Sequence, residues 1–155
     1  MPKSEFNYDA IVVGAGHAGI EAGLALARLG LKTIMLSITL DNVGYLACNP
    51  SIGGTAKGHL VREVDALGGE MGVAADKTLT QLRMLNGSKG AAVQSLRAQV
   101  DKYAYHNYMK SVLENEPNIH LRQGEVKELI AEENAIKGVK TVYGLTYYAP
   151  VVVLA

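Results

Sequence analysis

The sequence predicts an α/β fold in which a parallel sheet is joined by a small antiparallel β-meander. The first observation is an apolar, β-branched run at Tyr8–Val13 that stops at a glycine and leads into a helix from about Ala18 to Leu29. Gly30 follows where a left-handed residue commonly ends a helix, and Leu31–Leu36 has the pattern of a second strand. These segments predict a βαβ unit with a right-handed crossover.

Two further observations extend this fold. After Pro117 the sequence changes to short β segments separated by turn residues, at Ile119–Arg122, Val126–Ala131, Ile136–Tyr143 and Leu145–Tyr148. The last three predict a meander over about residues 126–148. The final run, Val151–Ala155, has the composition of a buried parallel strand. Because no turn or cap follows it, we expect a domain truncated at its C-terminal end.

The middle of the chain predicts a long loop and two helices. Periodicity is lost over Asp41–Gly58, where Gly, Asn, Pro and Ser accumulate, and a loop of that length is typical of a functional segment. Helical spacing returns at Leu60–Leu67. The longest helix is predicted over Val93–Leu113, whose apolar residues form one stripe.

The composition excludes several classes of protein. The chain has 155 residues, which predicts one domain, and is 48% hydrophobic and 19% charged, which excludes disorder. Fifteen basic and fifteen acidic residues remove any argument that the whole chain coats nucleic acid or an anionic membrane. One cysteine excludes a disulfide framework and a thiol cluster for zinc, so no metal site is expected. Without a signal peptide or membrane span, we expect a cytoplasmic protein.

The glycine turn after the first strand predicts a phosphate-binding site. It contains Gly14, Ala15, Gly16, His17, Ala18 and Gly19, the G-x-G-x-x-G pattern between a strand and a helix. The first glycine permits the tight turn, the second lets the backbone approach a diphosphate, and the third allows close helix–strand packing. The free N–H groups and the positive dipole of the helix N-terminus favour an anion. We interpret His17 as a spacer whose side chain points away from the phosphates.

One part of the nucleotide-binding pattern is missing. An acidic residue is expected at the end of the second strand, where it would bind the ribose hydroxyls. That position falls at Leu36–Ser37, and the nearest acid is Asp41. Ser37 is the remaining ribose candidate, although one hydroxyl cannot bind a diol as a carboxylate does.

Cys48 is the candidate catalytic residue, in the polar loop Cys48–Gly54. Its neighbours Lys57 and His59 would lower the thiol pKa and favour a nucleophile. From chemistry alone, however, a lone cysteine is more often a small, inert hydrophobe.

Several motifs in order resemble the GidA/MnmG family. They are Gly14–Gly19, Cys-Asn-Pro-Ser-Ile-Gly-Gly at 48–54, Lys-Gly-His-Leu-Val at 57–61, Asp-Ala-Leu-Gly-Gly at 65–69, Asn-Gly-Ser-Lys-Gly at 86–90 and Arg-Ala-Gln-Val-Asp-Lys at 97–102. The chain departs from the family pattern at Ile20, Gly23 and Ala92. The resemblance implies a Rossmann-like, glutathione-reductase-type FAD-binding domain, of which residues 1–155 are the N-terminal part.

The resemblance also implies an activity. Such proteins are flavoenzymes that add a carboxymethylaminomethyl or aminomethyl group to C5 of the wobble uridine in tRNA. They use NADH-reduced FAD and a one-carbon unit from methylenetetrahydrofolate, with the NADH site outside this chain. A MnmE-type GTPase is the partner, and the full-length protein is expected to be a homodimer. Cys48 would add to the uracil ring or assist at another step of the cycle.

Three more residues are candidates by this resemblance. Val126 lies where such flavoproteins contact adenine through backbone N–H and C=O groups, and a core-facing side chain is compatible with that role. From Lys77 to Lys110 there are six basic residues and one acid, a local excess that favours tRNA phosphates as strongly as it favours a solvated surface. Lys89 and Arg97 are the RNA-binding candidates because they lie in family-like motifs.

Three alternatives remain at this point. A related FAD- and folate-dependent tRNA uridine methyltransferase shares the glycine turn but should lack the Cys48–Gly54 motif. Another FAD oxidoreductase, such as a disulfide reductase, needs a cysteine pair, which one cysteine does not supply. A non-catalytic nucleotide-binding module is favoured only by the short chain.

Overall fold

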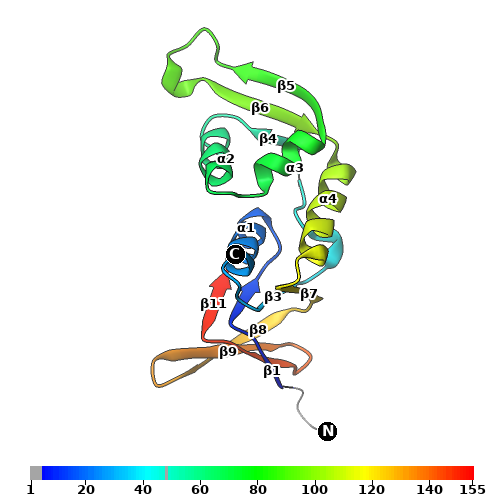
Figure 1. Cartoon of the computed structure of the whole chain (residues 1–155), viewed down its shortest axis with the longest axis vertical. Coiled ribbons are helices and arrows are strands. Elements are labelled where there is room, and N and C mark those ends of the chain that lie inside the picture. Colours follow the sequence, from blue (N-terminus) through cyan, green and yellow to red (C-terminus); the bar gives the residue numbers. More distant parts are fainter. Residues whose placement is uncertain (1–4, 48) are drawn as a thin grey trace. The chain divides into compact units, whose positions relative to one another are not determined.

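The computed structural model describes residues 5–47 and 49–155 as two compact units (Figure 1). The first unit contains the chain up to Gly44 and from Lys110 onward, and the second contains Tyr45–Met109. The predicted catalytic residue, Cys48, lies outside the described residues.

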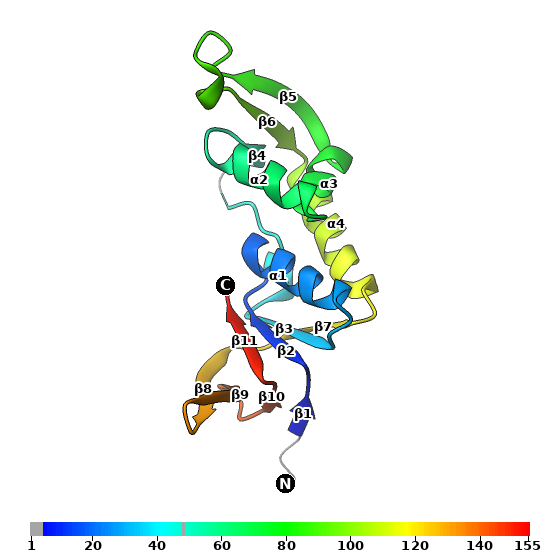
Figure 2. The same cartoon turned by 60° about the vertical axis from the view of Figure 1, so that its left-hand side comes forward.

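A four-stranded parallel sheet is the centre of the first unit. Its order is β11-β2-β3-β7, formed by Val151–Leu154, Ala10–Val13, Thr33–Ser37 and Ile119–Gln123 (Figure 2). All three neighbouring pairs are parallel. Every residue of β3 is buried, as its apolar composition requires in a sheet interior. The predicted parallel sheet, including its last strand, is confirmed.

Helix α1 (His17–Arg28) connects β2 to β3 and packs on this sheet. Gly23 brings the helix close to β3, because a Cβ there would lie 2.5 Å from Sδ of Met35. The helix ends at Leu29, and Gly30 has a φ of 80°, the predicted left-handed residue. The predicted βαβ unit is therefore confirmed, with helix bounds that differ by one residue at each end.

The meander lies in a second sheet of the same unit. Its order is β1-β10-β9-β8, formed by Glu5–Asn7, Thr146–Tyr148, Ala135–Thr141 and Val126–Glu132. The strands β8, β9 and β10 pair antiparallel, as predicted, and β1 adds a parallel edge that the sequence analysis did not predict. A shared apolar cluster joins the two sheets: Ile11, Ile34, Leu36, Val139, Tyr147 and Ala149.

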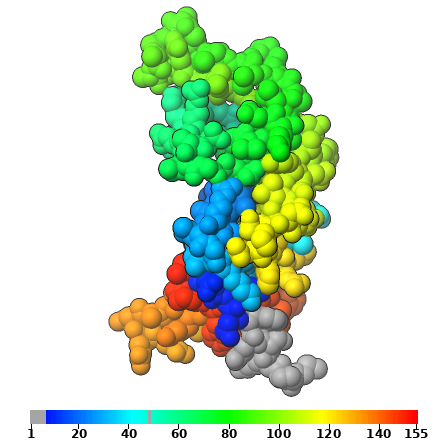
Figure 3. All heavy atoms as spheres, in the orientation of Figure 1, coloured from blue at the N-terminus to red at the C-terminus, as the bar shows by residue number. Residues whose placement is uncertain are grey.

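The second unit combines a three-stranded antiparallel sheet with helices. The sheet has the order β4-β6-β5, formed by Ser51–Gly53, Ser95–Val100 and Leu79–Leu85. The helices are α2 (Lys57–Ala66), α3 (Met71–Lys77) and α4 (Lys102–Asn115), whose last residues belong to the first unit. Short 3-10 helices occur at Leu40–Asn42 in the first unit and Ala91–Val93 in the second. In Figure 3 the atoms of the β5–β6 hairpin (green) lie above those of α2 in the same unit.

The predicted helix over Val93–Leu113 is wrong in its first half, where the chain forms β6. Leu96 and Val100 fit a helical spacing, but the burial of Ala98 and Val100 follows the period of two of a strand. The helix begins only at Lys102, because Asp101 accepts a 2.8 Å hydrogen bond from the N–H of Ala104 and caps it.

The predicted loop Asp41–Gly58 also contains regular structure, since β4 and the start of α2 lie within it. Helix α2 covers the helical spacing predicted at Leu60–Leu67. Among the helices of residues 5–47 and 49–155, none combines the length and apolar character of a bilayer span.

Candidate functional site

The glycine turn lies at the carboxyl end of β2, the edge of a parallel sheet where ligands bind in open α/β folds. Gly14 has a φ of 108°, and its N–H donates a 2.8 Å hydrogen bond to the carbonyl of Leu36 on the neighbouring strand. A Cβ at Gly14 would collide with the carbonyl oxygen of Ala155. Packing inside the unit therefore already requires glycine at this position.

Gly19 has a similar role in the first turn of α1. A Cβ there would collide with the carbonyl oxygen of Gly14. Glycine at this position lets the helix approach the turn and the sheet, as predicted for the third glycine of the pattern.

Gly16 differs from both, because nothing in the unit requires it. Its φ of −74° suits any residue, it is exposed, and a Cβ there would meet no atom within 4 Å. It is the N-cap of α1, so no side chain caps the free N–H groups of the first turn, and that turn contains no acid. An open, uncapped helix start without negative charge suits a phosphate group.

The other residues of the turn support this arrangement. Ala15 is buried, and its carbonyl accepts a 2.9 Å hydrogen bond from the N–H of Gly44. Ala18 is exposed beside Gly16. His17 is half-buried and its Nε2 atom is buried, a placement that suits our interpretation of His17 as a spacer.

Ser37 and the segment before Val126 lie side by side at the same edge. The carbonyl of Ser37, the last residue of β3, accepts a 2.8 Å hydrogen bond from the N–H of Gly124. The Ser37 hydroxyl donates to the carbonyl of Thr39 at 2.9 Å, so only its lone pairs remain for a ligand. Val126 begins β8 and packs its side chain against the apolar cluster. The roles of Ser37 and Val126 in nucleotide binding remain predictions.

Asp41, the first acid after β3 in the sequence, is exposed in the short 3-10 helix Leu40–Asn42. The N–H of Asp41 donates to Oγ1 of Thr39 at 3.3 Å, which caps that helix. No group of three or more His, Cys, Asp or Glu side chains arranged for a metal ion occurs in the described part of the chain.

The segment after Cys48 belongs to the second unit. Pro50 accepts a 2.8 Å hydrogen bond from the N–H of Val100, and β4 then pairs with β6. Of the two residues predicted to activate the thiol, Lys57 begins α2 and His59 is half-buried in its first turn. Partial burial lowers the pKa of Lys57.

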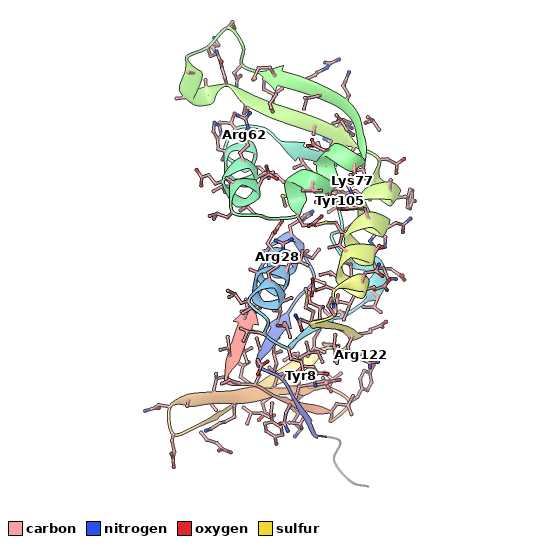
Figure 4. All side chains as sticks on the ribbon, in the orientation of Figure 1. Tyr8, Arg28, Arg62, Lys77, Tyr105 and Arg122 are labelled. Atoms are coloured by element: carbon pink, nitrogen blue, oxygen red, sulfur yellow. The ribbon has the colours of Figure 1, made fainter. Side chains whose placement is uncertain are left out.

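Within the second unit, the structure separates the basic residues from Lys77 onward into two groups. The Nζ atoms of Lys77 and Lys102 lie 4.9 Å and 4.2 Å from the ring centroids of Tyr108 and Tyr45 (Lys77 is labelled in Figure 4). Lys89 and Arg97 belong to the hairpin instead: Lys89 is exposed in the β5–β6 turn, and Arg97 lies in the middle of β6. Arg83, not singled out by the sequence analysis, lies opposite Arg97.

Tyr108, whose ring contacts Lys77, leads to a prediction about how stability depends on pH. The Tyr108 hydroxyl donates a 2.7 Å hydrogen bond to Glu70, and burial, this bond and the Glu70 charge raise the pKa of Tyr108 to about 12. The folded state therefore favours the neutral phenol. The stability contributed by the Tyr108–Glu70 hydrogen bond is fully present below the ordinary pKa of 10.0, and it is lost as pH rises through about 12.

Thermal denaturation of the chain between pH 9 and pH 12 measures this effect. We expect Tyr108→Phe to lower the midpoint at pH 9 and to reduce its fall above pH 10. Tyr103→Phe, which removes a hydroxyl from a 79% exposed side chain, is the control and should follow the wild type. Identical pH dependence in the wild type and Tyr108→Phe would contradict the assignment.

The strand–glycine turn–helix unit, the parallel sheet and the meander define an α/β protein of the Rossmann-like class. Among solved structures, the Mycobacterium smegmatis Sdh1 complex in its apo form shares this fold, with a TM-score of 0.71 and 18% identity over 98% of this chain and 34% of that chain. At that identity the likeness concerns the fold alone.

The chain belongs to the family described as "Glucose inhibited division protein A", whose sequence profile matches residues 9–155. It is 64% identical over 149 residues to the tRNA uridine 5-carboxymethylaminomethyl modification enzyme MnmG of Alkaliphilus oremlandii, covering 96% of this chain and 24% of that protein. The crystal structure of Aquifex aeolicus GidA superposes with a TM-score of 0.92 and 52% identity, over 96% of this chain and 25% of that one. The chain thus spans about a quarter of the length of these relatives.

Proposed function

We propose that this chain is the FAD-binding part of an enzyme that modifies C5 of the wobble uridine in tRNA. Two observations support the proposal: the name of its 64% identical relative, and the open space at Gly16 in an otherwise tightly packed glycine turn. The second carries most weight for the cofactor, because glycine at that position has no role in the packing of the unit itself.

The residues at the sheet edge fit an FAD molecule. The diphosphate would lie against the first-turn N–H groups beside Gly16, where the helix dipole favours negative charge. A ribose hydroxyl would donate one hydrogen bond to Ser37, and the adenine would meet the backbone of Val126. When bound, FAD supplies the two-electron redox chemistry that such an enzyme requires.

Cys48 would supply the nucleophile or assist at another step. C5 of uracil is a weak nucleophile until a thiolate adds at C6 and moves the C5–C6 π electrons toward the O4 carbonyl. C5 of this enolate would then bond to the one-carbon unit, whose bond to the folate nitrogen breaks and leaves its electron pair on that nitrogen. Loss of the C5 proton and expulsion of the thiolate restore the aromatic ring and free Cys48.

The remaining components of the reaction lie outside this chain. We propose NADH as the reductant, methylenetetrahydrofolate as the one-carbon donor and glycine or ammonium as the amine. A MnmE-type GTPase would be the partner of the full-length homodimer in the cytoplasm. The support for these components is membership of the family, of whose named relatives this chain covers about a quarter.

The experiment that tests the function uses the full-length parent and tRNA with an unmodified wobble uridine. After incubation with the cofactors and the GTPase partner, nucleoside mass spectrometry should detect carboxymethylaminomethyluridine or aminomethyluridine. Appearance of 5-methyluridine would instead favour the methyltransferase alternative, and unchanged uridine with a colourless protein would contradict the proposal.

A further inference from the structure

The β5–β6 hairpin has two chemically different faces. Leu82 and Leu96 on one face line a cavity of about 220 Å³ with residues of α2 and α3, among them Arg62 (Figure 4). The opposite face has the cross-strand pairs Gln81–Gln99 and Arg83–Arg97. Because side chains alternate along a strand, these polar pairs point away from the cavity.

The two arginines on this outer face lie directly opposite each other. Arg83 is exposed and Arg97 is half-buried, and directly opposed side chains of an antiparallel pair have Cβ atoms about 5 Å apart. Residues 79–100 contain three basic residues and no acid. Within the described part of the chain, neither guanidinium is paired with a carboxylate. Like charges in this position destabilise a sheet, so folding alone does not explain the pair.

The third strand has a glycine opposite one of the two arginines. Gly53 of β4 lies opposite Arg97 on the other side of β6 and has no side chain. A Cβ at Gly53 would collide with the carbonyl oxygen of Leu96, so the close pairing of β4 and β6 requires glycine here. As a result, β4 places no side chain at the position directly opposite Arg97.

We infer that Arg83 and Arg97 together bind one phosphodiester group of the RNA substrate. Two guanidinium groups at this spacing present several N–H donors to one phosphate, and the anion would relieve their mutual repulsion. Strand β4 begins three residues after Cys48, so a phosphate bound here holds the RNA next to the loop that contains the candidate nucleophile. The inference rests on the proposed function, which supplies RNA as the ligand.

The test measures binding of a synthetic anticodon stem-loop RNA to the full-length parent by fluorescence anisotropy over a range of salt concentrations. Variants are Arg83→Gln, Arg97→Gln and the double variant, with Lys127→Gln on the exposed surface of β8 as the control. Loss of one phosphate contact should reduce the slope of log K against log salt by about 0.7 to 0.9, which weakens binding about five- to eightfold at about 0.1 M salt.

Binding of one phosphate by both arginines leads to two specific predictions. The double variant should lose one contact in total, so the effects of the single changes should not multiply. The thermal midpoint of each variant should equal or exceed that of the wild type, because removal of either arginine relieves the like-charge pair. Lys127→Gln should bind as the wild type does.

The outcomes separate this inference from the proposed function. Wild-type protein that does not bind the RNA would contradict the proposed function itself. Wild-type protein that binds, together with a double variant whose salt slope is unchanged or falls by twice the expected amount, would contradict the shared site and leave the proposed function standing.

Discussion

Gly19→Ala is expected to destabilise the first unit by about 3 kcal/mol, the upper end of the usual range for overpacking. Helix propensity alone predicts the opposite, because alanine in place of glycine stabilises a helix by about 1 kcal/mol. The contact decides the sign, because the new Cβ would collide with the carbonyl oxygen of Gly14, a residue whose own N–H is hydrogen-bonded to Leu36 of β3. Backbone atoms held in this way cannot move aside at low cost.

Chemical denaturation of the chain, followed by circular dichroism, measures the change. Gly87→Ala is the matched control, since a Cβ at Gly87 meets no atom within 4 Å and that variant should keep nearly wild-type stability. If Gly19→Ala were as stable as the wild type or more stable, helix α1 would not approach the glycine turn as closely as described.

Cys48→Ser in the full-length parent is expected to abolish tRNA modification and to leave bound FAD unchanged. A serine hydroxyl is a far weaker nucleophile than a thiolate at neutral pH, while the change removes no group from the glycine turn. Nucleoside mass spectrometry of the treated tRNA measures activity, and the visible absorption of the purified variant measures bound flavin.

One control and two alternative outcomes accompany this variant. Its thermal midpoint should match that of the wild type. Any loss of activity is then due to the missing thiol and not to unfolding. Turnover at the wild-type rate would contradict a catalytic role for Cys48, and loss of the flavin would show that the residue acts on the cofactor site instead.

Local patterns in the sequence were enough to predict most of the first unit. The strand, glycine turn and helix at residues 10–28 are specified by neighbouring residues, and Gly30 marks the helix end. The meander was predictable because its turns carry their own signals, such as Glu133 and Asn134, both with positive φ. The edge strand β1 has no such signal, since its partner β10 lies about 140 residues away in sequence.

Patterns that depend on distant partners were not predictable in this way. Leu96 and Val100 satisfy a helical spacing and a strand spacing equally well, and only the pairing of β6 with β4 and β5 decides between them. The same register places Arg83 opposite Arg97. The sequence showed that both residues are basic, but it did not show that they face each other. A tally of charges contains no information about which side chains face each other.

The candidate cofactor site shows the same division. The motif identified the turn and a separate role for each of its three glycines, but not which atoms each glycine contacts. The structure shows that Gly14 and Gly19 are required by internal packing, whereas the space at Gly16 is left open. For Ser37, whose hydroxyl already donates to Thr39, the sequence suggested a ligand role that the structure limits to accepting a hydrogen bond.

Titration of FAD into the full-length Gly16→Ala parent is the most direct test of the cofactor site. The change should alter stability by no more than about 1 kcal/mol, because a Cβ at this N-cap position meets no protein atom. It should nevertheless weaken FAD binding at least about tenfold, equivalent to about 1.4 kcal/mol, because the methyl group would occupy space assigned to the diphosphate. A variant that folds normally and binds FAD as tightly as the wild type would contradict the account.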